Sequence, residues 1–147
     1  MTHKSLFAIL AVALLAAPAG AQLAKGSGQR LKEAEVKKAL LGVDLNGFSP
    51  TYQMSWRECI DPAGETLYET PDQVLKGRLF INPEGLACFA YEDTGYSTAS
   101  CFSVYRQGKG IRFESDVKTV TGEPDSVFVT TKLVTGIKSC KPQSLTS

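Results

Sequence analysis

Histidine is almost absent from this chain, because the only one, His3, lies within the first 21 residues. These residues are laid out like a secretory signal peptide, and cleavage would leave a chain without imidazole. Such a chain cannot build a Ser-His-Asp or Cys-His arrangement, a zinc site that needs histidine, or a histidine pH switch. We therefore expect no catalytic residue, no metal ligand, no cofactor and no enzymatic activity.

An excess of charge of one sign is also missing. The chain has 16 Lys and Arg against 15 Asp and Glu, and loss of Lys4 with the signal would make the two numbers equal. Recognition of nucleic acid or of an anionic membrane surface depends on clustered excess positive charge. We expect no nucleic-acid partner on this basis.

Long apolar runs are restricted to the N-terminus. Lys4 is followed by an apolar run over 5–17 and by a small-x-small cleavage site, Ala19-Gly20-Ala21. The run is too short to span a bilayer stably, and no stop-transfer segment follows it, so we expect no stable membrane insertion after cleavage. No cysteine adjoins the site, which argues against a lipoprotein. The pattern predicts a periplasmic or extracellular protein.

The division of the chain follows from these features. We expect a signal peptide over 1–21 and a flexible leader over 22–30, since the latter is polar and contains two glycines. A single β-rich domain follows over 31–141, and the polar residues 142–147 are predicted to be a frayed tail.

The four cysteines show no C-x-x-C spacing, so a thioredoxin-type redox motif is absent. An even number of cysteines in an exported chain predicts two disulfides, for which three connectivities exist. A hairpin over 86–106 that turns near Thr94-Gly95 would place Cys88 opposite Cys101, close enough to bridge. We therefore favour Cys88–Cys101, which leaves Cys59 to pair with Cys140.

One helix and many short strands are predicted. Val36, Ala39, Leu40 and Val43 form an apolar stripe at helical spacing, which indicates a helix over 31–41. From residue 45 onward the apolar period is two, and turns containing Pro and Gly separate the runs. We expect a mainly β fold, in which the N-terminal helix packs on a small antiparallel barrel or sandwich of about seven or eight strands.

Two groups of residues suggest recognition surfaces. The tip of the 86–106 hairpin has two tyrosines around a polar, glycine-containing loop, a composition suited to partner contact. This possible partner-contact loop consists of Tyr91, Glu92, Asp93, Thr94, Gly95, Tyr96 and Ser97. A second group is acidic, and we interpret it as a solvated sheet edge. It comprises Glu58, Asp61, Glu65, Glu69 and Asp72.

Aromatic residues are spread over six predicted strands. They are Trp56, Phe80, Phe89, Tyr105, Phe113 and Phe128. A ligand-binding barrel would line its cavity in this way, and so would a filled core. Because the chain is short, we interpret them as a filled core.

Part of the sequence resembles a group of small exported proteobacterial proteins of uncharacterised function. The resemblance covers about residues 31–115, and it rests on a helix that ends in Leu40-Leu41-Gly42, a strand with Trp56, Lys76-Gly77-Arg78, Ala87-Cys88-Phe89-Ala90-Tyr91 and Ser100-Cys101-Phe102-Ser103-Val104. At Arg78-Leu79 the chain departs from that group, which usually has Trp there. The resemblance implies an exported β-rich domain and no established catalytic residues.

Three functions are compatible with the sequence. We favour a non-enzymatic binding module that contacts a protein or another cell-envelope component through its loops. By architectural analogy with small periplasmic barrels, this would be an inhibitor of a lytic enzyme or protease. The alternative is a barrel that carries a small apolar ligand. A carboxylate-based hydrolase is a distant third, since it needs two acids about 5–10 Å apart in a cleft.

Overall fold

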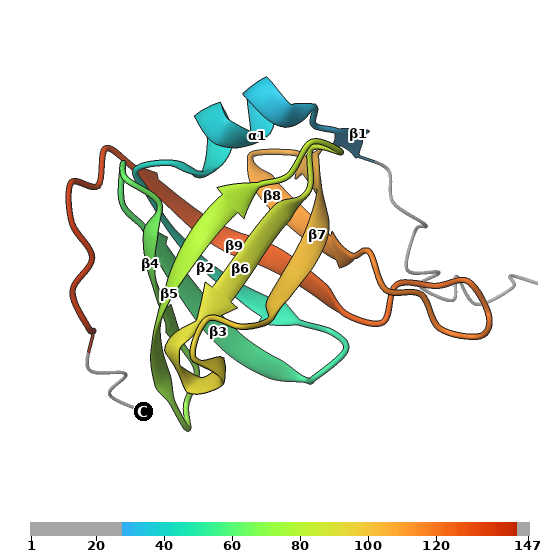
Figure 1. Cartoon of the computed structure of the whole chain (residues 1–147). Helices are drawn as coiled ribbons and strands as arrows, with labels where there is room; N and C mark the ends of the chain where they lie inside the picture. The colour runs from blue at the N-terminus through green and yellow to red at the C-terminus, as the bar shows by residue number, and fades with distance from the viewer. Residues whose placement is uncertain (1–27, 144–147) are drawn as a thin grey trace, which may run out of the picture.

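The computed structural model describes residues 28–143, so the predicted signal peptide, most of the predicted leader and the last four residues lie outside it. The elements follow the chain in the order β1 (Gln29–Arg30), α1 (Glu33–Leu40), β2 (Val43–Ser49), β3 (Met54–Ile60), β4 (Glu65–Glu69), β5 (Val74–Ile81), β6 (Ala87–Tyr91), the 3₁₀ turn η1 (Glu92–Thr94), β7 (Ala99–Gln107), β8 (Gly110–Ser115) and β9 (Val127–Thr135). Figure 1 shows these strands wrapped into a barrel with α1 across one end.

The barrel is a simple up-and-down meander. Each strand from β2 to β9 pairs antiparallel with the next, and β9 pairs back with β2, which closes a ring of eight strands. Closure leaves no long unpaired edge, which is a common solution for antiparallel sheets of this size. The mainly β prediction is confirmed, and the structure is a barrel rather than a sandwich.

Helix α1 closes one end of the barrel. Val36 and Leu40 are fully buried and belong to a core cluster with residues of the barrel interior. The helix begins and ends inside the predicted range of 31–41. Glu35 accepts a hydrogen bond from the Lys32 N–H at the start, and Gly42, with φ of +72°, turns the chain into β2 after the end.

The expectation of a flexible leader is wrong for its last residues. Gln29 and Arg30 form β1, which pairs with Arg106 and Tyr105 of β7. The pairing of β6 with β7 ends at Phe102. Beyond this residue the same edge of β7 has no β6 partner, and β1 pairs with it instead. The unpaired backbone groups of β7 thus explain why a polar segment is ordered here.

Both disulfides form as predicted. Cys88 and Cys101 are directly opposite on β6 and β7, with Cα atoms 4.0 Å apart, and Cys59 on β3 bonds to Cys140. The second bridge closes a sequence separation of 81 residues, a loop whose constraint stabilises the fold by about 4 kcal/mol in the chain-entropy model. Two structural disulfides indicate an oxidising compartment. Within 28–143, no helix has the length and apolar character to cross a membrane.

Candidate functional site

A pocket lies at the end of the barrel opposite α1, and we call it the open-end pocket. Its volume is about 190 Å³. An apolar cavity of about 150 Å³ is known to accommodate benzene, so the open-end pocket has room for a ring-sized group. Its walls are mostly aromatic and consist of Tyr52, Trp56, Glu58, Tyr68, Phe89, Tyr91, Ser100, Phe102, Phe113, Ser126 and Phe128.

The alternation of the strands directs these side chains inward. Trp56 and Glu58 are two residues apart on β3, as are Phe89 and Tyr91 on β6, so each pair shares the interior face. The rings pack edge to face, with the Trp56 and Phe128 centroids 5.7 Å apart. Such contacts hold the walls in a defined shape before any ligand arrives.

Two glycines make the room that the pocket aromatics need. A Cβ atom at Gly47 would come within 2.6 Å of the Trp56 ring, and one at Gly77 would come within 2.5 Å of the Tyr91 ring. Both rings therefore lie directly over the backbone of a neighbouring strand. Sequence reasoning missed this role, although a glycine inside a strand is a known signal of close approach.

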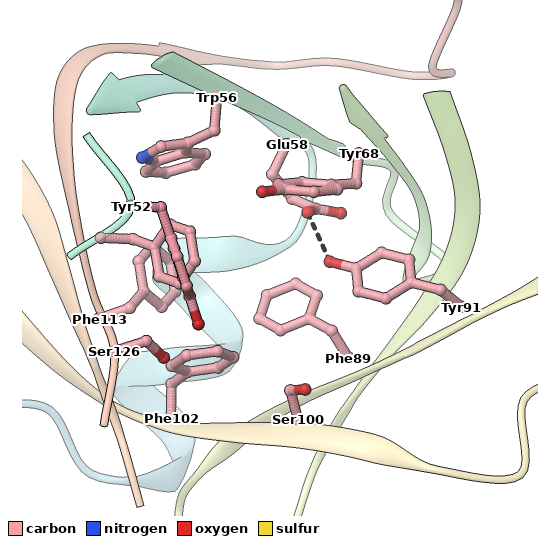
Figure 2. A pocket seen from close by; sticks show the side chains of 11 residues that line it. Tyr52, Trp56, Glu58, Tyr68, Phe89, Tyr91, Ser100, Phe102, Phe113 and Ser126 are labelled. Carbon is pink, nitrogen blue, oxygen red and sulfur yellow. Dashed lines mark hydrogen bonds between the residues drawn. The ribbon is translucent and has the colours of Figure 1, made fainter. Parts of the chain in front are cut away.

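Glu58 is the acidic residue in the lining of the pocket. Its side chain is buried, with the residue only 4% exposed, and its Oε2 accepts a hydrogen bond of 2.8 Å from the Tyr91 hydroxyl. Figure 2 shows this carboxyl group among the rings of Tyr68, Phe89 and Tyr91. Burial raises the pKa of Glu58 from 4.5 to about 8, although the Tyr91 hydrogen bond opposes the change. The carboxyl is thus mostly protonated at pH 7.

The two tyrosines beside Glu58 remain protonated. Burial raises the pKa of Tyr68 to about 12, and the charge that Glu58 can carry adds to this effect. The pKa of Tyr91 is raised well above its ordinary value for the same reasons. Both hydroxyl groups are therefore hydrogen-bond donors over the physiological pH range.

Three buried polar atoms have no hydrogen-bond partner within residues 28–143. They are Glu58 Oε1, Trp56 Nε1 and Thr66 Oγ1, and the first two belong to residues that line the pocket. Buried polar groups are nearly always paired, and each exception needs an explanation. The Thr66 hydroxyl is close enough to Glu58 to lower its pKa, so these two atoms can pair with each other, and a ligand that reaches the carboxyl group is the other explanation.

Outside the barrel wall, a second group of buried charges has a different character. Arg57 donates three hydrogen bonds to the Asp44 carboxylate, of 2.9, 3.1 and 2.7 Å, and another to Glu69. These three residues, which we call the outer ion cluster, are covered by the C-terminal segment. Arg57 also donates to the Lys141 carbonyl, and the Gln143 N–H donates to Glu69. Gln143, expected to lie in a frayed tail, is therefore held in place.

The interpretation of the acidic residues as a solvated edge is wrong for two of the five. Glu58 and Glu69 are buried, on opposite sides of the barrel wall, whereas Glu65 and Asp72 are exposed. Asp61 is half-buried in a turn, where its carboxylate accepts hydrogen bonds from the Ala63 and Glu65 N–H groups. The C-terminal segment that covers Glu69 is remote in sequence, so periodicity alone does not reveal its burial.

The interpretation of the aromatics as a filled core holds for only part of the barrel. Trp56, Phe89 and Phe113 belong to the buried core cluster and Phe128 packs against it, but these four of the six predicted aromatics also line the open-end pocket. Phe80 is instead about half exposed, and Tyr105 lies outside the pocket lining. Tyr52, Tyr68 and Phe102 also line the pocket, and they were not among the six predicted aromatics. The alternation of β4 and β7 places Tyr68 and Phe102 on the interior face of the barrel.

The predicted partner-contact loop lies at the rim of the pocket. Tyr91, its first residue, is half-buried, and its hydroxyl points inward and donates to Glu58. Tyr96 is 46% exposed, and the Arg78 guanidinium lies 5.7 Å from the centre of its ring. Glu92 accepts a hydrogen bond from the Lys76 N–H, which ties the loop to β5.

Hydrolysis by a pair of carboxylates is not supported by the pocket. Within the described residues, Glu58 is its one acidic lining residue, and a pair of acids in one cleft is required. Nor do three His, Cys, Asp or Glu side chains within 28–143 gather closely enough to hold a metal ion. The arrangement is suited to binding.

Three comparisons with known proteins found no match for the chain. No family model matches the chain, and neither a curated protein nor a solved structure matches it. The resemblance to small exported proteobacterial proteins therefore stays a prediction from the sequence motifs.

Proposed function

We propose that the protein is an exported, non-enzymatic binding protein that holds a small molecule with a ring-sized apolar group in the open-end pocket. The observation that carries this proposal is an aromatic pocket of about 190 Å³ whose lining, within the described residues, has one buried carboxyl group, that of Glu58. Largely apolar, pre-formed pockets with few polar groups are the usual form of small-molecule sites. Eight-stranded barrels are known to hold one small ligand.

The energetics favour occupation of this pocket. Aromatic walls that face water gain stabilisation when an apolar ligand covers them, on the order of 25 cal/mol for each Å² removed from water. The walls are already ordered by ring contacts among Trp56, Phe113 and Phe128, so little conformational entropy is lost on binding.

The place of action follows from the signal sequence together with the disulfides. Cleavage after Ala21 would release the chain into the periplasm or the medium, and an oxidising compartment supports both disulfides. No cysteine stands at the cleavage site for lipid attachment, so the protein would act without a lipid anchor.

Trp56 supplies a direct test, because it is the only tryptophan in the chain and lines the pocket. Benzyl alcohol, a ring with a neutral polar group, should change the Trp56 fluorescence in a saturable manner. Ser100→Phe, which places a ring at the pocket mouth, should abolish this change.

The matched control is Ser103→Phe, because alternation places Ser103 on the outer face of the same strand. This variant should bind like the wild type. The proposal fails if benzyl alcohol causes no saturable change up to its solubility limit, or if both variants respond equally.

A second candidate function has its own observation. Exposed apolar side chains lie in or beside the loops at the open end: Tyr52 between β2 and β3, Val74 at the start of β5, Tyr96 between β6 and β7, and Val117 and Val120 between β8 and β9. Exposed apolar groups that gather on one face mark interaction sites. We propose a macromolecular partner in the cell envelope for this rim, in the specific form of a lytic enzyme or protease that the protein inhibits.

A lysozyme inhibition assay tests the specific form of this candidate. Wild-type protein should inhibit, and the double variant Tyr96→Ser, Val120→Ser should inhibit at least tenfold less, because it removes two apolar contacts from the rim. The absence of inhibition by wild-type protein would count against it.

A further inference from the structure

We propose that the ligand of the open-end pocket carries an organic ammonium group, a protonated amine on a ring or short apolar chain, which pairs with Glu58. This inference rests on the proposed small-molecule function and names the chemical class of the ligand. It follows from three features of the pocket: its one acidic group, the rings around that group, and the placement of the nearest cation.

Glu58 offers a carboxyl group with incomplete hydrogen bonding. Its Oε2 accepts from the Tyr91 hydroxyl, and the nearby Thr66 hydroxyl lowers the pKa of the group, but no hydrogen bond to Oε1 is completed within residues 28–143. An ammonium N–H would satisfy this oxygen with a charge-assisted hydrogen bond, which is stronger than a neutral one.

The rings around Glu58 also favour a cation. Figure 2 shows Tyr68, Phe89 and Tyr91 around the carboxyl group, with Trp56 beside Glu58 on β3. The faces of aromatic rings carry negative charge density and attract cations, and cages of this type recognise ammonium ligands in general. A carboxylate within such a cage adds to the attraction.

No positive side chain of the described residues lines the pocket. The nearest cation along the chain, Arg57, points to the outer face of β3, where Asp44 and Glu69 already bind it. An anionic ligand would therefore meet Glu58 without a compensating charge, which is costly in a buried site.

Ionisation of Glu58 is within reach of a cationic ligand. With a pKa of about 8, about one tenth of the groups are ionised at pH 7. The groups that face Glu58 from neighbouring elements are the Tyr68 and Tyr91 hydroxyls, with Tyr52 at the pocket mouth and Arg57 behind the strand. Because the pKa of Glu58 itself is about 8, cation binding near pH 7 should release one proton from Glu58.

Three compounds with the same ring separate the possibilities: benzylamine, which is protonated between pH 6 and 8, its neutral isostere benzyl alcohol, and benzoate. Binding is followed through Trp56 fluorescence. We expect benzylammonium to bind at least tenfold more tightly than benzyl alcohol at pH 8, and benzoate to bind most weakly. The affinity for benzylammonium should fall by nearly tenfold between pH 7 and pH 6, because Glu58 must lose a proton before it can pair with the cation.

Glu58→Gln is the decisive variant, because its amide oxygen can still accept from Tyr91. It should bind benzylammonium at least tenfold more weakly at pH 8, without pH dependence, while benzyl alcohol binding persists and shows that the pocket is folded. If benzyl alcohol binds as tightly as benzylammonium, or if benzylammonium affinity is independent of pH, the ammonium assignment is overturned and the binding function stands. If none of the three compounds binds, both are overturned.

Discussion

Arg57 and Glu58 are neighbours on β3 and are almost equally buried, with 3% and 4% of each residue exposed, but they lie on opposite sides of the barrel wall. On the outer side, burial opposes the charge of Arg57. The hydrogen bonds and negative charges of Asp44 and Glu69 outweigh this and raise the pKa of the guanidinium. On the inner side, Glu58 has two neutral hydroxyl groups: that of Tyr91 donates to its Oε2, and that of Thr66 lies close enough to lower its pKa.

Under the proposed function, the difference separates a structural site from a binding site. A buried charge whose partners are all supplied by the chain contributes to a defined native state, and removal of one partner is strongly destabilising. A buried polar group with incomplete hydrogen bonding costs stability, and a ligand that supplies the missing partner offsets that cost. The outer ion cluster is of the first kind, and we propose that the open-end pocket is of the second.

The largest expected effect concerns the pH dependence of Glu58. The unfolded chain releases this proton near pH 4.5, and the folded chain retains it up to about pH 8. Between these values the folded state binds more protons, so the free energy of unfolding falls as pH rises. The whole change is on the order of 5 kcal/mol, about 1.4 kcal/mol for each pH unit.

Glu58→Gln should remove this contribution, which makes the variant about 3 kcal/mol more stable than wild type at pH 7. Urea unfolding at pH 5, 6, 7 and 8 measures the difference, and the other carboxylates cancel in the comparison. Parallel pH profiles for the two proteins would contradict the buried, mostly protonated state of Glu58.

A somewhat smaller effect is expected on the outer side. Arg57→Met leaves Asp44 and Glu69 buried as two unpaired acids, and we expect a loss of about 3–5 kcal/mol. The control is Arg78→Met, which removes an exposed pair with Glu65 and should cost less than about 1 kcal/mol. Denaturant unfolding measures both. Equal losses for the two variants would show that the outer ion cluster is no more important than a surface pair.

The smallest effect sharpens the inner side of the comparison. Tyr91→Phe removes the hydrogen bond to Glu58 Oε2 while the ring stays in place, at a cost of about 1–2 kcal/mol in unfolding free energy. Loss of this bond should also raise the pKa of Glu58 further, because the bond favours the ionised form. Infrared titration of the buried carboxyl measures this shift, and a lower pKa in the variant would refute the assigned direction.

Local sequence patterns predicted much of the fold. The period of two after residue 45 indicated the strands and which residues of each strand share a face. The hairpin register predicted the Cys88–Cys101 pair, because directly opposed residues in an antiparallel pair are close enough to bridge. These features depend on residues near one another in the chain or in one hairpin.

The site required information that local patterns lack. Arg57 is buried on the outer face because the Cys59–Cys140 disulfide holds the C-terminal segment over it. The two cysteines are 81 positions apart, so this contact leaves no local pattern in the sequence. Gly47 and Gly77 leave the space that the rings of Trp56 and Tyr91 occupy in the pocket wall, because a Cβ atom at either position would collide with the ring. Whether aromatics fill a barrel or surround a space depends on such volumes, which the sequence period does not encode.

Because α1 closes one end of the barrel, both candidate functions use the opposite, open end. A molecule held beside Glu58 can enter and depart only past the rim that carries Tyr52 and Tyr96. A macromolecule docked on that rim would close the open end of the barrel. The docked partner would thereby slow the release of a small molecule bound in the pocket. Occupancy of the rim would then change the kinetics of ligand binding without any change of fold.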